Sequence, residues 1–188
     1  MTQHPEALSG AGPASRPLRV GMFGGAFDPP HKAHRALAEA ALTQLGLDVL
    51  HILPTGQAWH KSRVLTPAEH RLSMCQLAFG DLPNTRIDSR EIRRQGPSYT
   101  ADTLAALAEE HPDADLYTIV GDDAAAGITT WERYDEVAAR STLVVVDRPG
   151  APVELPEQFP WARVEVPRLE VSSTDLRARV SDGRPLDY

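Results

Sequence analysis

Cysteine, aromatic residues and long apolar runs are all scarce in this sequence. The single cysteine, Cys75, excludes an internal disulfide and a metal site built from several cysteines. Its sequence neighbours are mostly apolar, so we expect a buried, unreactive thiol. Because no run of about 18 apolar residues is present, no membrane span is predicted. Residues 1–17 also lack the apolar segment of a signal peptide, and we expect a flexible leader on a cytoplasmic protein.

Positively charged residues are fewer than negatively charged ones. The chain has 19 Lys and Arg against 26 Asp and Glu, which gives a formal net charge of −7 with His neutral. This acidity excludes a general binder of nucleic acids or anionic membranes. An anionic substrate would have to be held by a few well-placed cations and main-chain N–H groups. We therefore expect most carboxylates to lie away from any anion-binding site.

Short apolar runs alternate with amphipathic stretches from Leu18 onward, which predicts strands at 18–23, 49–53, 85–87, 116–120, 142–146 and 163–166. Helices are expected between them, at 34–45, 66–79, 101–110, 131–137 and 172–180. Thr66–Glu69 is interpreted as a capping box with Pro67 at the first helical position, and Ser172 as the cap of the last helix. This alternation predicts an α/β fold, a Rossmann-like doubly wound parallel sheet in a single domain over residues 18–188. Such sheets bind ligands beyond the carboxyl ends of their strands.

The loop after the first predicted strand carries two histidines three residues apart. It begins with Gly24 and Gly25 and runs through His31 and His34 into a predicted helix. The glycines let the backbone approach a ligand closely, and the helix start offers free N–H groups and a positive dipole. Neither a G-x-G-x-x-G fingerprint nor a Walker A sequence is present. Taken alone, the histidines are also compatible with a helix cap, a packing role or half of a zinc site.

This loop resembles the signature of the nucleotidyltransferase superfamily, G-G-x-F-D-P followed by H-x-G-H. Further segments match the nicotinate mononucleotide adenylyltransferase family in the same order, namely PSYT at 97–100, VGDD at 120–123 and VSSTDLR at 171–177. A looser match joins residues 54–56 to His60 and Lys61. The resemblance covers residues 18–180. The sequence departs from the pattern at Ala33, where the family has glycine, and by ending soon after the last motif.

The resemblance implies roles for the residues of the first loop. Gly24, Gly25 and Phe27 would line the bed of the ATP triphosphate. His31 and His34 would hydrogen-bond the phosphates and stabilise charge at the α-phosphorus as catalytic residues. Considered without the resemblance, Phe27 is equally suited to core packing.

Other implied ATP contacts come from two later segments. Ser173 and Thr174, at the start of the last helix, would bind the phosphates of ATP, and Arg177 one turn later would act in catalysis. Lys61, in the loop after the second strand, would reach the same phosphates. A solvated surface lysine is the alternative for Lys61.

The remaining implied residues follow the fourth strand or belong to the acceptor site. Gly121 and Asp123 would contact ATP, with Asp123 accepting from a ribose hydroxyl or helping to hold a metal. A helix cap is the alternative for Asp123. Thr100 and Trp131 would bind the nicotinate nucleotide, although Trp131 has helical spacing with Tyr134 and is also suited to the core.

The implied reaction is adenylyl transfer from ATP to nicotinate mononucleotide, giving deamido-NAD and pyrophosphate in NAD biosynthesis. Mg²⁺ would be carried by the ATP phosphates, with no metal site made by the protein alone. Nicotinamide mononucleotide and phosphopantetheine are alternative acceptors, and a noncatalytic nucleotide-binding module is an alternative of another class. A class I tRNA synthetase fragment is disfavoured because no K-M-S-K-S-like loop or basic face is visible. A homo-oligomer stays open.

Overall fold

Six strands form a central sheet in the computed structural model, which describes residues 15–57, 63–147 and 153–186. They are β1 (Arg19–Gly25), β2 (Val49–Pro54), β3 (Thr85–Ile87), β4 (Asp115–Val120), β5 (Thr142–Asp147) and β6 (Ala162–Glu165). Their order is β3-β2-β1-β4-β5-β6, and every neighbouring pair is parallel. Phe23 of β1 pairs with Ile52 of β2 on one side and Ile119 of β4 on the other. The chain therefore winds outward from β1 in both directions, which confirms the predicted fold class.

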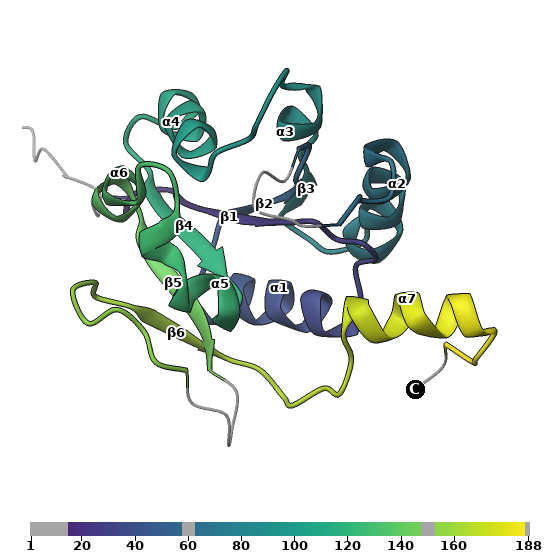
Figure 1. Cartoon of the computed structure of the whole chain (residues 1–188). Helices are drawn as coiled ribbons and strands as arrows, with labels where there is room; N and C mark the ends of the chain where they lie inside the picture. The colour runs from purple at the N-terminus through teal and green to yellow at the C-terminus, as the bar shows by residue number, and fades with distance from the viewer. Residues whose placement is uncertain (1–14, 58–62, 148–152, 187–188) are drawn as a thin grey trace, which may run out of the picture.

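Helices cover both faces of this sheet, with α1 and α4 on opposite sides (Figure 1). They are α1 (Lys32–Gln44), α2 (Ala68–Phe79), α3 (Arg90–Arg93), α4 (Thr100–Glu110), α5 (Asp122–Ala126), a 3-10 helix η1 (Ile128–Thr130), α6 (Tyr134–Arg140) and α7 (Ser173–Asp182). Because neighbouring strand residues point to opposite faces, Phe23 and Met22 belong to different apolar clusters. Phe23 packs in one cluster with Leu37 of α1 and Phe79 of α2. Met22 packs in the other with Leu104 of α4.

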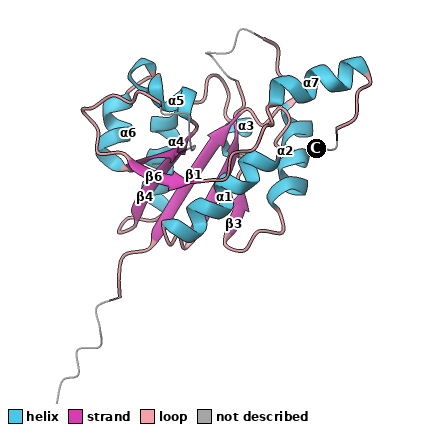
Figure 2. Ribbon diagram, turned by 90° about the horizontal axis from the view of Figure 1, so that it is seen from below, coloured by secondary structure: helices cyan, strands magenta, loops and turns pink. Residues whose placement is uncertain are grey.

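The last helix lies apart from these two layers. In Figure 2, α1 lies across the sheet, whereas α7 extends away from the strands. As predicted, Ser172 caps α7, because its side chain accepts a hydrogen bond from the N–H of Asp175 at 3.1 Å. This cap fixes where α7 begins, and therefore where the residues of the last motif lie.

Two local predictions are wrong. The capping box at Thr66 does not form: α2 begins at Ala68, after Pro67, and no side chain caps it. The main chain of Thr66 is instead engaged by Asp28, which accepts from its N–H, and by Arg71, which donates to its carbonyl. Trp131 is not helical, because η1 ends just before it and Arg133 adopts a left-handed conformation (φ 51°) before α6 begins. Short elements such as α3 and α5, with 4 and 5 residues, were not predicted because they span too little sequence to show a helical period.

Three further expectations concern exposure and the ends of the chain. Cys75 is fully buried, and burial raises the pKa of its thiol to about 12, so it is unreactive as expected. Of the leader expected at residues 1–17, residues 1–14 lie outside the described residues. None of the described helices combines the length and the apolar character that crossing a membrane requires.

Candidate active site

Two adjoining cavities lie where β1 and β4 end. The larger has a volume of about 660 Å³ and the smaller a volume of about 200 Å³. Both are lined by Gly24–Ala26 at the end of β1 and by Gly121 and Ala124 after β4. The chain leaves β1 toward β2 on one side and β4 lies on the other, so the shared wall stands at the topological switch point. Doubly wound sheets bind their ligands at this position.

The larger cavity collects polar groups from two distant helix starts. His31 and His34 come from the start of α1, whereas Ser173, Thr174 and Arg177 come from the start of α7. The first turn of a helix has N–H groups without intrahelical partners and carries the positive end of the helix dipole. The structure thus brings together, around one cavity, the phosphate-binding residues expected from both motifs.

The two histidines hold each other in a fixed arrangement. The main-chain N–H of His31 donates to Nδ1 of His34 at 3.2 Å, and the two rings stack with their centroids 3.8 Å apart. They form a reciprocal capping box at the start of α1. Because Nδ1 of His34 accepts a hydrogen bond, the proton of the neutral ring lies on Nε2. His34 therefore lines the larger cavity as a ring with an Nε2–H donor.

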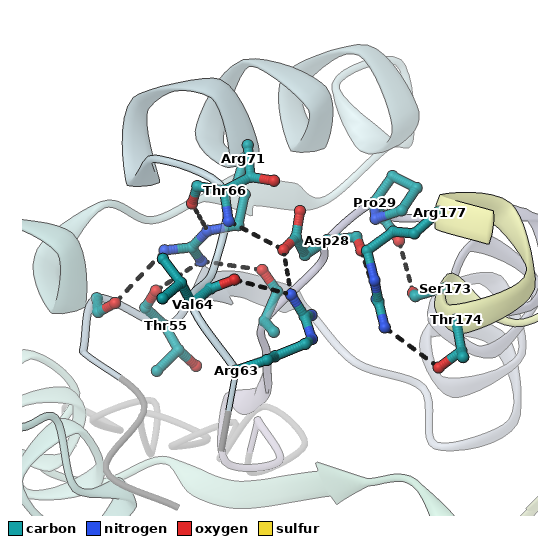
Figure 3. Close-up of polar contacts among 12 residues, drawn as sticks. Asp28, Pro29, Thr55, Arg63, Val64, Thr66, Arg71, Ser173, Thr174 and Arg177 are labelled. Carbon is teal, nitrogen blue, oxygen red and sulfur yellow. Dashed lines mark hydrogen bonds and ion pairs between the residues drawn. The ribbon is translucent and has the colours of Figure 1, made fainter. Parts of the chain in front are cut away.

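The start of α7 is tied directly to the loop after β1 (Figure 3). Ser173 donates through Oγ to the carbonyl of Pro29 at 2.8 Å, and Arg177 donates through Nη1 to the carbonyl of Asp28 at 2.9 Å. The other guanidinium nitrogen of Arg177, Nη2, donates to Oγ1 of Thr174 at 3.2 Å. The bonds to Pro29 and Asp28 join segments more than a hundred residues apart and so tie the two halves of the larger cavity to each other.

Asp28 pairs with an arginine that the sequence analysis missed. Its carboxylate is only 3% exposed and accepts from Nη1 of Arg63 at 2.7 Å and from the N–H of Thr66 at 3.0 Å (Figure 3). Burial opposes ionisation of Asp28, but the hydrogen bonds from Thr66 and Arg63 outweigh it and lower its pKa to about 2. Arg63 also lines the larger cavity. Its position in the loop after the second strand, two residues beyond Lys61, was the only signal in the sequence.

Three carboxylates line the larger cavity. They belong to Asp28, Asp122 and Asp123, of which Asp123 was expected here as an ATP contact. Arg63 balances the charge of Asp28. Asp122 and Asp123 occupy the first turn of α5 after Gly121, where carboxylates are favoured beside N–H groups that lack intrahelical partners. Gly121 and Asp123, which were expected to contact ATP, both line the larger cavity.

Phe27 combines a cavity position with a core position. Its main chain has a positive φ of 48°, which is unusual for a residue with a side chain, and its ring is 2% exposed. The ring makes edge contacts with Phe23, Phe79 and His34, at centroid distances of 5.4, 5.7 and 5.2 Å. Phe27 therefore joins the core to the His34 ring, although it also borders the larger cavity.

The smaller cavity has a different chemistry. Thr100 and Trp131 line it, as expected for an acceptor site, together with Tyr99 and the acidic residues Glu91 and Glu132. Among the described residues that line it, none has a cationic side chain. Thr100 is the first residue of α4, so main-chain N–H groups at that helix start are the available donors. Lys61, expected to reach the ATP phosphates, lies outside the described residues.

Comparison with known proteins identifies the family. A sequence model of the family described as cytidylyltransferase-like matches residues 22–179. The chain belongs to the cytidylyltransferase-like family. The matched span runs from β1 into α7 and includes every residue discussed above that lines either cavity.

Two relatives are similar to this chain over most of their length. A protein from Albidiferax ferrireducens, named a probable nicotinate-nucleotide adenylyltransferase, is 46% identical over 168 residues, or 86% of this chain and 85% of that relative. A protein of the same name from a Roseiflexus species is 43% identical over 178 residues and covers 90% of this chain and 89% of itself. These identities are high enough to compare activities as well as folds.

A solved structure supports the fold assignment of this cytidylyltransferase-like chain. The Plasmodium falciparum nicotinic acid mononucleotide adenylyltransferase complexed with NaAD superposes with a TM-score of 0.73. The superposition covers 90% of this chain and 87% of that one, at 19% identity. At this identity the likeness concerns the fold alone.

Proposed function

We propose that the protein is a nicotinate-nucleotide adenylyltransferase, which transfers the adenylyl group of ATP to nicotinate mononucleotide in NAD biosynthesis. Relatives of that name are 46% and 43% identical over most of this chain. The observation that carries the proposal is the pair of adjoining cavities with different chemistry, one rich in donors for phosphate and one lined by an aromatic side chain. A reaction between a polyphosphate and a pyridine nucleotide needs such a pair.

In this proposal the two substrates meet at the shared wall. The triphosphate of ATP lies in the larger cavity, against His31, His34, Ser173, Thr174 and Arg177. The pyridine ring of the acceptor lies in the smaller cavity, against the face of Trp131, and its carboxylate meets N–H groups at the start of α4. A pyridinium ring is cationic, so Trp131 and the acidic lining of this cavity favour it. Gly24 and Gly25 leave room for the reacting phosphates between the two ligands.

The chemical step is a direct displacement at phosphorus. An oxygen of the acceptor phosphate forms a bond to the α-phosphorus, while the bond from that phosphorus to the bridging oxygen of the β-phosphate breaks. The electron pair leaves with pyrophosphate. A phosphate monoester is already an anion near neutral pH, so no protein base is needed to activate it. His34, through Nε2–H, and Arg177, through its guanidinium, stabilise the charge that moves onto the leaving group.

The described residues fit Mg²⁺ carried by ATP. Mg²⁺ prefers oxygen ligands and keeps several waters, and the larger cavity offers Asp122 and Asp123 to contact such a hydrated ion. Within the described ranges no group of three or more His, Cys, Asp and Glu side chains is arranged to hold a metal by itself. When bound, Mg²⁺ would neutralise charge on the departing pyrophosphate.

An acceptor-resolved assay tests the proposal. The purified protein is incubated with ATP, Mg²⁺ and one acceptor at a time, and pyrophosphate release is measured. We expect the highest kcat/KM with nicotinate mononucleotide. A higher value with nicotinamide mononucleotide or phosphopantetheine would overturn the choice of acceptor. ATP binding without turnover on any of these acceptors would instead indicate a noncatalytic module.

A further inference from the structure

Arg71, on α2, is a buried arginine that the proposed mechanism does not use. Its side chain is among the most deeply buried in the described protein, at 1% exposure. Nε donates to the carbonyl of Thr66 at 2.8 Å, and Nη1 donates to the carbonyls of Ala26 and Thr55 at 2.9 and 2.7 Å. Nη2 donates to the carbonyl of Gly56 at 3.4 Å. Figure 3 shows Arg71 with Thr55 and Thr66. One guanidinium thus connects the loop after β1, the loop after β2 and the start of α2.

Burying the guanidinium of Arg71 costs free energy, which the hydrogen bonds to it must offset. A buried cation loses its hydration, and burial lowers the pKa of Arg71. Every hydrogen bond that the described structure gives the Arg71 side chain ends on a main-chain carbonyl, and none ends on a carboxylate. The planar guanidinium is the only side-chain group with five donors in a fixed fork, so it can bind several carbonyls in different directions at once.

Two of the four carbonyls that Arg71 binds, those of Ala26 and Thr55, belong to residues that line the cavities. Ala26 lines the larger and the smaller cavity, and Thr55 lines the smaller one. Gly56 packs so closely on α3 that an added Cβ would lie 2.3 Å from the carbonyl oxygen of Glu91, another residue of the smaller cavity. Among the described residues that line either cavity, Arg71 itself is absent. It therefore contacts the walls from behind, without reaching the ligand space.

We propose that Arg71 is a positioning residue for adenylyl transfer, holding the Ala26 wall and the Thr55–Gly56 wall in the one relation that aligns donor and acceptor phosphates. The proposal rests on the proposed function, because it concerns the alignment of its two substrates. In-line attack requires the reacting atoms to be held close and collinear, and a misplacement of about 1 Å costs about 100-fold in rate. Arg71 therefore acts on the chemical step more than on the binding of either substrate.

The test compares Arg71→Met, Arg71→Lys and a matched control. Arg71→Met removes the donors at similar length, whereas Arg71→Lys keeps the charge but loses the fork. Arg19→Met is the control, since Arg19 also donates to a main-chain carbonyl, that of Leu45 at 2.8 Å, but at the opposite end of β1. For each variant, kcat and both KM values are measured, together with the Kd of ATP in the absence of acceptor and the melting temperature.

We expect Arg71→Met to lower kcat by about 100-fold while the Kd of ATP changes by less than about 5-fold. Arg71→Lys should recover only a small part of this loss, because a single ammonium cannot reach all of the carbonyls. Arg19→Met should leave kcat unchanged even if it lowers the melting temperature. Gly56→Ala, which disturbs the same junction without changing the charge, should reproduce the loss of kcat.

Three results would overturn the inference. The first is a folded Arg71→Met protein with a kcat close to wild type, which would make Arg71 a residue for stability alone. The second is full recovery by Arg71→Lys, which would show that charge and not geometry matters. If Arg71→Met does not fold, the test rests on Arg71→Lys and Gly56→Ala. The third result that would overturn the inference is then a kcat close to wild type in both of these variants. A failure of the proposed function can be distinguished from a failure of the inference about Arg71. In the first case the wild-type protein itself would release no pyrophosphate with nicotinate mononucleotide.

Discussion

The two cavities at the carboxyl edge of the sheet share one wall but differ in the side chains that complete them. The larger is completed by His31, His34 and Arg177, which come from the starts of α1 and α7. The smaller is completed by Trp131 and the start of α4, without a cationic side chain among its described lining residues. The larger cavity is thus suited to bind anionic groups, whereas the smaller cavity is suited to an aromatic ring and to groups that accept main-chain hydrogen bonds.

This difference explains how an acidic protein can bind two anions. A net charge of −7 excludes attraction of anions by the surface as a whole, but it does not prevent a local site from binding them. In the larger cavity Arg63 balances Asp28, and Arg177 and the two helix starts supply positive potential. The acceptor carboxylate needs only N–H groups. Selective binding would therefore depend on a few placed groups, and we expect that each cavity can be disabled separately.

The largest expected effect is at His34. His34→Ala removes the Nε2–H donor that we propose for the transferring phosphate and should lower kcat by about 100- to 1000-fold, as for the loss of one oxyanion donor. The KM of the acceptor should hardly change, since the smaller cavity is untouched. Steady-state kinetics with each substrate varied in turn measures this. An unchanged kcat would show that His34 has no catalytic role.

Arg177 should come next. Arg177→Met removes both the proposed phosphate contact and the bond to the carbonyl of Asp28, and we expect kcat/KM for ATP to fall by about 100-fold. The matched control is Arg179→Met on the same helix, because Arg179 pairs with Asp175 and is absent from the described lining of the larger cavity. An equal loss in both variants would assign the effect to α7 as a whole.

Asp28 should make stability depend on pH. Its pKa falls from 3.8 in the unfolded chain to about 2 in the folded protein, so its carboxylate contributes about 2 kcal/mol above about pH 4. This contribution is lost as the pH drops through the folded pKa. Urea unfolding of wild type and Asp28→Asn at pH 7, 5 and 3 should show a difference that shrinks toward low pH.

A surface pair provides the control for Asp28. Asp81 pairs with Arg35 but its side chain is 71% exposed, so Asp81→Asn should change the free energy of unfolding very little. If the effect of Asp28→Asn were the same at all three pH values, the stabilisation would not come from its ionised carboxylate.

The smallest effect tests the other cavity. Trp131→Ala should raise the KM of nicotinate mononucleotide by about 10-fold, through loss of an aromatic contact with the pyridinium ring, and leave the KM of ATP unchanged. Trp161→Phe is the control, since Trp161 lies outside both cavities among the described residues. A rise in the KM of ATP equal to that of the acceptor would erase the distinction between the two cavities.

Most of the fold could be predicted because its signals are local. Alternating apolar runs and helix caps such as Ser172 require only neighbouring residues, and the parallel order then places every loop of interest at one edge. The prediction that Trp131 is helical is wrong because its spacing to Tyr134 and Val137 is helical, although the chain turns at Arg133 before α6 begins. Periodicity alone does not distinguish a helix from a short turn that leads into one.

The missed side chains are those whose partners are distant main-chain groups or buried charges. An arginine inside a helical pattern, such as Arg71, suggests an exposed face, and only the three-dimensional structure shows the carbonyls of Ala26 and Thr55 around it. The role of Arg63 likewise depends on its contact with Asp28, which is 35 positions away in the chain. Composition alone likewise carries no information about where the acidic residues lie, and only the VGDD motif placed one of them, Asp123, at the larger cavity.

The division of labour between the cavities is tested most directly by a crystal structure of the protein with deamido-NAD bound. We expect the phosphates beside His34 and Arg177, the adenylate in the larger cavity and the pyridine ring against Trp131. A dinucleotide bound in the reverse direction, with its pyridine ring in the larger cavity, would contradict it.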